Sequence, residues 1–349
     1  MAVLYLAEQG AELHKKSQRL VVEKFGQVIQ EVRTMELDQV VVIGNVHLTP
    51  SAVTFLLDKG IDTVFLSYHG KFKGRLISQF GKNVALRQIQ FAKFADGGVV
   101  LDVAKRYVIG KLSNCRTLLR RFNAELQEEE IAKRILGIRK YLERVEFAKD
   151  LESLRGIEGI SAVEYFQGLK KLIRDPGMRF DGRTRRPPRD EVNALLSFGY
   201  TLLVNLIQTC VYTAGLDPYL GCLHSVDYGR PSLVLDLMEE FRPVLVDSVV
   251  LKCINKKMIT PRDFIVQPDA EIPPEGEELE ELTSEDYPVL LTHEGIKKFI
   301  TQFEERLKER TFYFPQERRL TYRDICLEQV RKLVRHLKEE EAYESFKMR

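Results

Sequence analysis

Short apolar runs alternate with turn residues over the first eighty positions of the chain. Runs such as "RLVVEKFG" and "QVVVIGN" have the composition and length of short strands. One segment, "TPSAVTFLLDKG", has helical spacing instead, beginning with a Thr-Pro pair and ending at Gly60. The pattern predicts a small N-terminal β domain, residues 1–82, that contains a single helix.

Beyond residue 82, apolar side chains recur at every third or fourth position, which is typical of helices that pack on one face. Residues 83–349 are therefore expected to form a larger, predominantly α-helical domain, and the predicted fold class is α+β. The helices with the clearest period are predicted over 83–96, 99–125, 127–154, 294–310 and 322–341.

A 23-residue segment from Ala194 to Leu216 contains no charged residue and is long enough to span a bilayer. Polar side chains interrupt it, and such groups find partners more easily inside a protein than in lipid. A buried central helix is therefore favoured over a membrane span, and no membrane partner is expected. The interrupting residues are Ser197, Thr201, Asn205, Gln208 and Thr213.

Composition places the chain among soluble globular proteins: 349 residues, 44% hydrophobic, 30% charged, with a net charge of only +2. Its five cysteines show no CxxC spacing, which argues against a disulfide framework and a zinc cage. Reduced, mostly buried thiols in a cytoplasmic protein are expected, and the first residues do not resemble a secretory signal.

Charge is unevenly distributed along the chain. Residues 170–190 hold eight Lys or Arg against three Asp, so Arg183, Arg185, Arg186 and their neighbours could hold phosphates; ordinary solvated surface is the alternative. The last predicted helix also carries basic residues, which could face DNA or water. Residues 269–286 hold nine acids and no base, which predicts a mobile acidic linker near 267–287.

Asp236, Glu239 and Glu240 would lie on one face of a short helix, twelve residues or more after His224. Such an acidic stripe is more often solvated than catalytic. A turn-rich segment around His224 could nevertheless fold back and bring the imidazole beside a carboxylate, a combination that suits Mn²⁺ as well as Mg²⁺.

A third ligand is needed, and Glu158 is the best candidate. It lies between Gly156 and Gly159, two residues that cost helix stability. Their missing side chains would let a phosphate or another backbone approach closely, or would permit a tight helix crossing.

Three blocks, "RGIEGISAVEYF", "PPRDEVNALLSFGYTLL" and "GCLHSVDYGRPSLVLDLMEEFRP", occur in this order with helices between them. Together they resemble the signature blocks of the CRISPR-associated adaptation integrase family ("Cas one"), and the likeness covers essentially the whole chain. The resemblance implies that Glu158, His224 and Glu239 bind one Mg²⁺ or Mn²⁺. His224 could instead serve as a proton acceptor.

The same resemblance assigns roles to further residues. Asp236 matches another catalytic acid of the family, whereas Glu240 is expected to be solvated. Family members carry Asp or Glu at the position of Glu239. Three residues of the second block, Asn193, Ser197 and Tyr200, are expected to support the site or contact DNA. Arg183, Arg185 and Arg186 would hold backbone phosphates of DNA without reading its bases.

The implied function is metal-dependent DNA endonuclease and integrase activity, in which the 3′-hydroxyl of a captured duplex attacks a phosphodiester at the edge of a CRISPR repeat. The implied partners are double-stranded DNA, a second copy of the chain joined through the β domain, and a small protein of the "Cas two" family. A non-catalytic DNA-binding scaffold of the same fold is the main alternative, and hydrolysis of a small phosphate ester is another.

Overall fold

The computed structural model describes all residues except 1, 79–82, 185–186, 267–286 and 349. The chain divides into two compact units, residues 1–82 with 291–297 and residues 83–290 with 298–349. The short segment 291–297 was expected with the helical part but groups with the first unit. Arg185, Arg186 and most of the predicted acidic linker lie outside the described residues.

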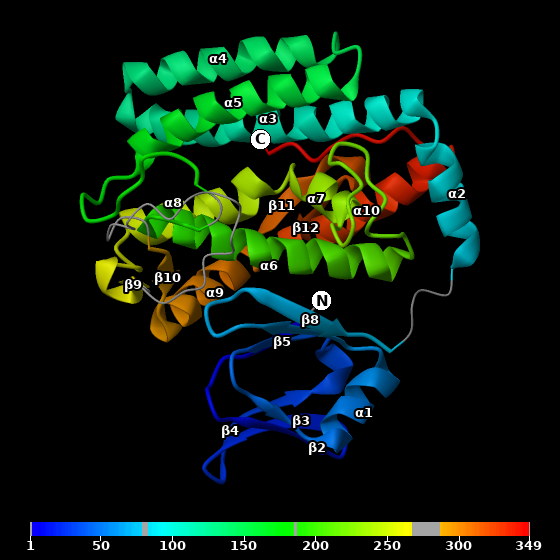
Figure 1. The fold of residues 1–349 in the computed structure, drawn as a ribbon, viewed down its shortest axis with the longest axis vertical. Helices are drawn as coiled ribbons and strands as arrows, with labels where there is room; N and C mark the ends of the chain where they lie inside the picture. The colour runs from blue at the N-terminus through cyan, green and yellow to red at the C-terminus, as the bar shows by residue number, and fades with distance from the viewer. Residues whose placement is uncertain (1, 79–82, 185–186, 267–286, 349) are drawn as a thin grey trace, which may run out of the picture. The chain divides into compact units, whose positions relative to one another are not determined.

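Two four-stranded sheets build the first unit (Figure 1). In one sheet the order is β1-β5-β7-β8, with parallel pairing from β1 to β7; in the other it is β4-β3-β2-β6. The strands are β1 (Val3–Leu6), β2 (Glu12–Lys16), β3 (Arg19–Lys24), β4 (Gln27–Arg33), β5 (Gln39–Ile43), β6 (His47–Leu48), β7 (Asp62–Leu66) and β8 (Phe72–Leu76).

The predicted helix of this unit is α1 (Pro50–Lys59). The Thr49 side chain accepts a hydrogen bond from the Ala52 N–H at 3.3 Å, and Gly60 ends the helix with a φ of 65°. Alternate apolar side chains of the strands form a shared core with α1. Strand β4 lies at a sheet edge and is exposed over nearly its whole length.

Helices dominate the second unit, and α3, α4 and α5 lie side by side in one layer (Figure 1). The helices are α2 (Val84–Phe94), α3 (Gly97–Leu126), α4 (Glu129–Val145), α5 (Leu151–Leu172), α6 (Glu191–Ala214), α7 (Ser232–Met238), α8 (Ser248–Asn255), α9 (His293–Lys308) and α10 (Tyr322–Leu337). Short strands form two further pairs: β9 (Phe264–Val266) with β10 (Val289–Leu291), and β11 (Arg310–Tyr313) with β12 (Arg318–Thr321).

The prediction of one helix over 127–154 is wrong, because the chain breaks after Val145 and restarts as α5. Asp150 caps the new helix by accepting a hydrogen bond from the Ser153 N–H at 2.7 Å, and the Ser153 side chain accepts in return. Glu158 therefore belongs to α5, a helix separate from α4.

Helix α6 contains the uncharged segment, and it is long and apolar enough to cross a membrane by composition alone. Its most apolar window is 78% buried inside the protein. The prediction of a buried central helix is therefore confirmed. Its threonine side chains bond to carbonyls one turn earlier, as Thr201 does to the Ser197 oxygen at 3.0 Å and Thr209 to the Asn205 oxygen at 2.9 Å.

After α10 the chain runs as an extended segment, residues 341–348, that we call the strap. Its Tyr343, Phe346 and Met348 side chains are buried against the helices. The Asn114 side chain of α3 donates to the Phe346 carbonyl at 2.9 Å and accepts from the Met348 N–H at 2.6 Å. The strap is thus an integral part of the second unit.

Candidate active site

Three separate elements supply the predicted ligands. Glu158 lies in α5, His224 lies in the connection between α6 and α7, and Glu239 is the first residue after α7. The structure brings Glu158 and Glu239 to the side chain of Lys111, which comes from α3, and places His224 beside Glu239. Gathering acids and a histidine from distant segments in one place is typical of a site built for chemistry.

Two cations hold the carboxylates of this site. The Lys111 ammonium contacts Glu158 Oε1 and lies 2.6 Å from Glu239 Oε2, and Arg242 Nη1 lies 3.1 Å from Glu239 Oε1. Burial alone would raise the pKa of Glu239, but Arg242 and Lys111 outweigh it and lower that pKa to about 2. Burial alone would lower the pKa of Lys111, but Glu239 and Glu158 outweigh it and raise that pKa. Glu239 is therefore an anion throughout the physiological range.

Asp236 positions His224 and is completely buried. Its carboxylate accepts hydrogen bonds from the backbone N–H groups of Cys222, Leu223 and His224 at 2.5, 2.9 and 2.9 Å. His224 Nδ1 lies 2.7 Å from Asp236 Oδ1, and because this carboxylate is an acceptor, we assign the proton to Nδ1. The lone pair is then on Nε2, which faces Glu239 Oε1 at 3.8 Å.

A close approach explains Gly221 at the start of this segment. A Cβ at Gly221 would lie 2.6 Å from Asp236 Oδ2 and 2.8 Å from the Leu233 nitrogen. The segment therefore passes α7 closely enough to wrap its backbone around the Asp236 carboxylate. The "GCLH" sequence combines this contact with the histidine that the carboxylate orients.

Helix α5 is tied to the His224 segment near Glu158. Arg155 Nε donates to the Leu223 carbonyl at 2.7 Å. Gly156 and Gly159 lie on the open side of α5, where no described atom lies within 4 Å of an added Cβ. The alternative of a tight helix crossing is therefore wrong among the described residues, and the two glycines leave a smooth surface on this side of α5.

Glu240 is not the solvated acid that the sequence predicted, because it is fully buried. It accepts hydrogen bonds from the Phe346 N–H at 2.6 Å, the Tyr343 hydroxyl at 3.1 Å and the Gln329 amide at 3.1 Å. Burial raises the pKa of Glu240 to about 8. The strap covers the helix face that would otherwise expose this residue.

The donor set fits a hard divalent cation, although the described residues include no His, Cys, Asp and Glu cluster already arranged around one. Two carboxylates already surround a cation, the Lys111 ammonium. Glu239 Oε2 is buried and has no well-aligned hydrogen-bond donor in the described part of the chain. His224 offers its Nε2 lone pair, while Nδ1 is held by a carboxylate, as metal-ligating histidines usually are.

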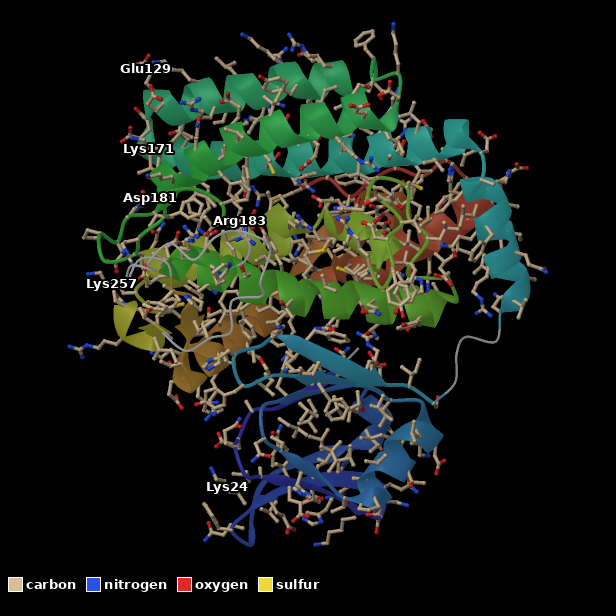
Figure 2. All side chains as sticks on the ribbon, viewed as in Figure 1. Lys24, Glu129, Lys171, Asp181, Arg183 and Lys257 are labelled. Atoms are coloured by element: carbon tan, nitrogen blue, oxygen red, sulfur yellow. The ribbon has the colours of Figure 1, made fainter. Side chains whose placement is uncertain are left out.

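The α6 residues that were expected to support the site or contact DNA bond to the Arg-rich connection between α5 and α6, which we call the basic loop. Asn193 is fully buried; its Oδ1 accepts from Arg183 at 2.8 Å and Thr184 N–H at 3.0 Å, and its Nδ2 donates to Gly182 and Asp190. No polar atom of this side chain is left for DNA, so a DNA contact by Asn193 is wrong. Figure 2 labels Arg183 on this loop.

Tyr200 connects the same loop to the site. Its ring lies under two guanidinium groups, those of Arg183 at 5.3 Å and Arg242 at 5.1 Å, and its hydroxyl donates to Asp247 at 2.7 Å. Burial raises the pKa of Asp247 to about 6. Ser197 lies 3.3 Å from Arg183 and completes this support. The expectation of a supporting role for Ser197 and Tyr200 is consistent with these contacts.

The basic side of α10 is less available than the sequence suggested. Arg323 and Lys332 are buried, and Arg323 pairs with Glu304 at 2.6 Å. Arg331 pairs with Glu328 at 2.5 Å. A DNA-binding role for this helix as a whole is therefore not supported.

Lys111 and Arg242 are the site residues that sequence reasoning missed. Arg242 follows Glu239 by three positions, a spacing that places charges side by side on a helix. Lys111 falls in the apolar stripe of α3, four positions from the buried Tyr107 and Cys115. A charged residue in a core stripe is the signal that could have found it.

The fold and this site together define a class of protein. The family model for CRISPR associated protein Cas1 matches residues 4–305. The chain therefore belongs to the Cas1 family, a β unit followed by a helical unit with acids and a histidine gathered on three elements.

Individual relatives agree with this assignment. A CRISPR-associated endonuclease Cas1 from Thermus thermophilus is 37% identical over 352 residues, covering all of this chain and 98% of the relative. A Cas4 exonuclease/Cas1 endonuclease fusion from Geobacter sulfurreducens is 36% identical, and the match covers 98% of this chain and 60% of the fusion. A solved CAS1 protein from Thermotoga maritima, 25% identical, superposes with a TM-score of 0.80 over 99% of this chain and all of that one.

Proposed function

We propose that this chain is a metal-dependent DNA endonuclease and integrase of CRISPR adaptation. The observation that carries the proposal is the arrangement of Glu158 and Glu239 around one cation, the Lys111 ammonium, with His224 Nε2 facing the other oxygen of Glu239 at 3.8 Å. The Thermus relative is named an endonuclease. A casposase of the same fold, 22% identical with a TM-score of 0.82, was solved with its integration product.

Glu158, Glu239 and His224 would hold Mg²⁺ or Mn²⁺, whose chemistry is to stabilise charge that develops on a phosphate oxygen. Asp236 keeps the His224 ring in one orientation and one tautomer. Arg242 forms an ion pair with Glu239. The Tyr200 ring contacts the guanidinium groups of both Arg242 and Arg183, and so links this ion pair to the basic loop. The reacting DNA would pass the smooth surface at Gly156 and Gly159.

Removing Glu158 is expected to abolish strand transfer. Glu158→Ala should lower the rate of joining a short duplex into a repeat-containing supercoiled plasmid by about 10³-fold or more, since a bound ion supplies several kcal/mol. Wild-type protein should be active with Mg²⁺ or Mn²⁺ and inactive with EDTA. The assay contains the "Cas two" partner, in line with solved complexes of this fold that contain Cas1 and Cas2.

Glu152→Ala is the matched control, because Glu152 is an exposed acid on the same helix. It should retain wild-type activity. Undiminished product from Glu158→Ala, or wild-type product in EDTA, would contradict the proposed site. Salt-sensitive DNA binding without any product would favour the non-catalytic scaffold.

A second copy of the chain is the partner that we propose for the first unit. Strand β4 is an edge strand with exposed apolar side chains: Val28 is 54% and Ile29 50% exposed, and Phe25, in the preceding turn, is 94% exposed. An apolar edge that is left uncovered favours pairing with another chain. Neighbouring strand residues point to opposite faces, so both faces of β4 are available.

Placing a charge on this edge is expected to separate the two copies. The wild type should have twice the 40.4 kDa mass of one chain in light scattering after size exclusion, whereas Ile29→Asp should have the single mass. Thr54→Asp on the exposed side of α1 should leave the mass unchanged. A wild-type mass of one chain, or a dimer that survives Ile29→Asp, would argue against this interface.

A further inference from the structure

Lys111 is the least expected residue in the site. The residue is 8% exposed, and its ammonium is held between two carboxylates that come from different elements, Glu158 of α5 and Glu239 after α7. A buried lysine is expensive unless it is paired, and here each acid supplies one partner. The side chain therefore joins α3, α5 and α7 at one point.

Two cations match the two carboxylates that meet at Lys111; the buried Asp236 is a further carboxylate, on the far side of His224. Glu158 and Glu239 carry two negative charges, and Lys111 and Arg242 carry two positive charges. Arg242 contacts Oε1 of Glu239, on the side that faces His224, while Lys111 contacts Oε2. Lys111 is thus the cation that contacts both carboxylates.

A divalent ion held by Glu158 Oε1 and Glu239 Oε2 would compete with the Lys111 ammonium for these oxygens, because ligand oxygens lie about 2.0–2.2 Å from such ions. An ammonium and a divalent ion cannot occupy one position, and at such separations their repulsion is strong. Arg242 can stay where it is, because it binds the outer oxygen and leaves Oε2 to the competing cations.

We propose that the Lys111 ammonium and the catalytic divalent ion are alternative occupants of one position between Glu158 and Glu239. The inference rests on the proposed metal site and adds the residue that competes for it. Lys111 holds the two acids together before the ion arrives, which prevents their mutual repulsion from opening the site. Binding of the ion then requires the flexible lysine side chain to rotate away.

Direct Mn²⁺ titration of the full chain, followed by the electron paramagnetic resonance signal of free Mn²⁺, tests this proposal without any DNA reaction. Lys111→Met should bind Mn²⁺ at least about tenfold more tightly than the wild type, because no ammonium has to be displaced. In EDTA the same variant should have a lower Tm than the wild type, since two acids are left without a cation between them. Addition of Mn²⁺ should raise the Tm of the variant by more than that of the wild type.

Lys105→Met is the control: Lys105 is partly exposed on the same helix, and its ammonium donates a hydrogen bond to the Glu146 carbonyl at 2.8 Å. It should change neither the Mn²⁺ affinity nor the Tm. Lys111→Gln, also neutral, gives a second measurement should the Met variant unfold in EDTA; refolding of the Met variant by Mn²⁺ would itself support the proposal.

The two proposals fail in different ways. Should the wild type bind Mn²⁺ and both neutral Lys111 variants bind it equally or more weakly, competition by Lys111 is overturned and the metal site stands. Should neither the wild type nor the Lys111 variants bind Mn²⁺, both the metal site and the competition are overturned.

Discussion

Glu239→Ala is expected to lose both strand transfer and stability. The rate should fall by about 10³-fold or more, and the free energy of unfolding by about 3–5 kcal/mol. Glu239 is the carboxylate that neutralises two buried cations, Arg242 and Lys111, and its side chain is only 3% exposed. Removing it leaves both cations with too little compensating charge.

Urea denaturation in EDTA, compared between Glu239→Ala and Glu158→Ala, separates the two effects. Glu158 pairs with Lys111, whereas Arg242 pairs with Glu239, and the Glu158 side chain is 23% exposed. Glu158→Ala should therefore lose activity equally but lose much less stability. Equal losses of unfolding free energy in the two variants would show that the contacts of Glu239 with Arg242 and Lys111 contribute less to stability than we infer.

Asp236→Asn is expected to weaken the site although Asp236 is not one of the proposed ligands. Its carboxylate receives three backbone N–H groups and orients His224. An amide nitrogen in this position opposes those donors, which should cost about 1–3 kcal/mol of stability. Loss of the fixed His224 tautomer should lower Mn²⁺ affinity and strand transfer by about 10–100-fold.

Asp227→Asn is the matched control for this measurement. Asp227 belongs to the same turn-rich segment, but its side chain is 58% exposed and bonds to Ser225 and Arg230. It should leave Mn²⁺ affinity unchanged. An Asp236→Asn protein with wild-type Mn²⁺ affinity would contradict the positioning role of Asp236.

The sequence was informative where the chemistry lies in local motifs. The residues Glu158, His224 and Glu239 could be named because each belongs to a distinctive block, and the structure does bring them together. The helix break after Val145 was missed because the apolar period continues through it, and only the Asp150 cap reveals the new start. Periodicity reports which face is apolar, not where a helix is interrupted.

Whether a polar residue is buried or solvated was harder to predict where a distant segment of the chain covers it. Glu240 has the spacing of a solvated acid, yet residues more than a hundred positions away bury it. For Lys111 the sequence shows a charge within an apolar stripe, but its partners could not be predicted, because they come from α5 and the turn after α7. Both outcomes depend on tertiary contacts that no local pattern contains.

The strap has a consequence for the order in which the protein assembles. Asn114 and Phe346 are 232 positions apart, and their hydrogen bond closes nearly the whole second unit into one loop. Closing such a long loop is entropically costly, and contacts of this sequence separation slow folding. During translation α3 leaves the ribosome long before residues 341–348, so Asn114 and Glu240 remain without these partners until synthesis of the strap is complete. We expect docking of the strap to be among the last folding steps, and the mature packing around Glu240 to form only once the strap has docked.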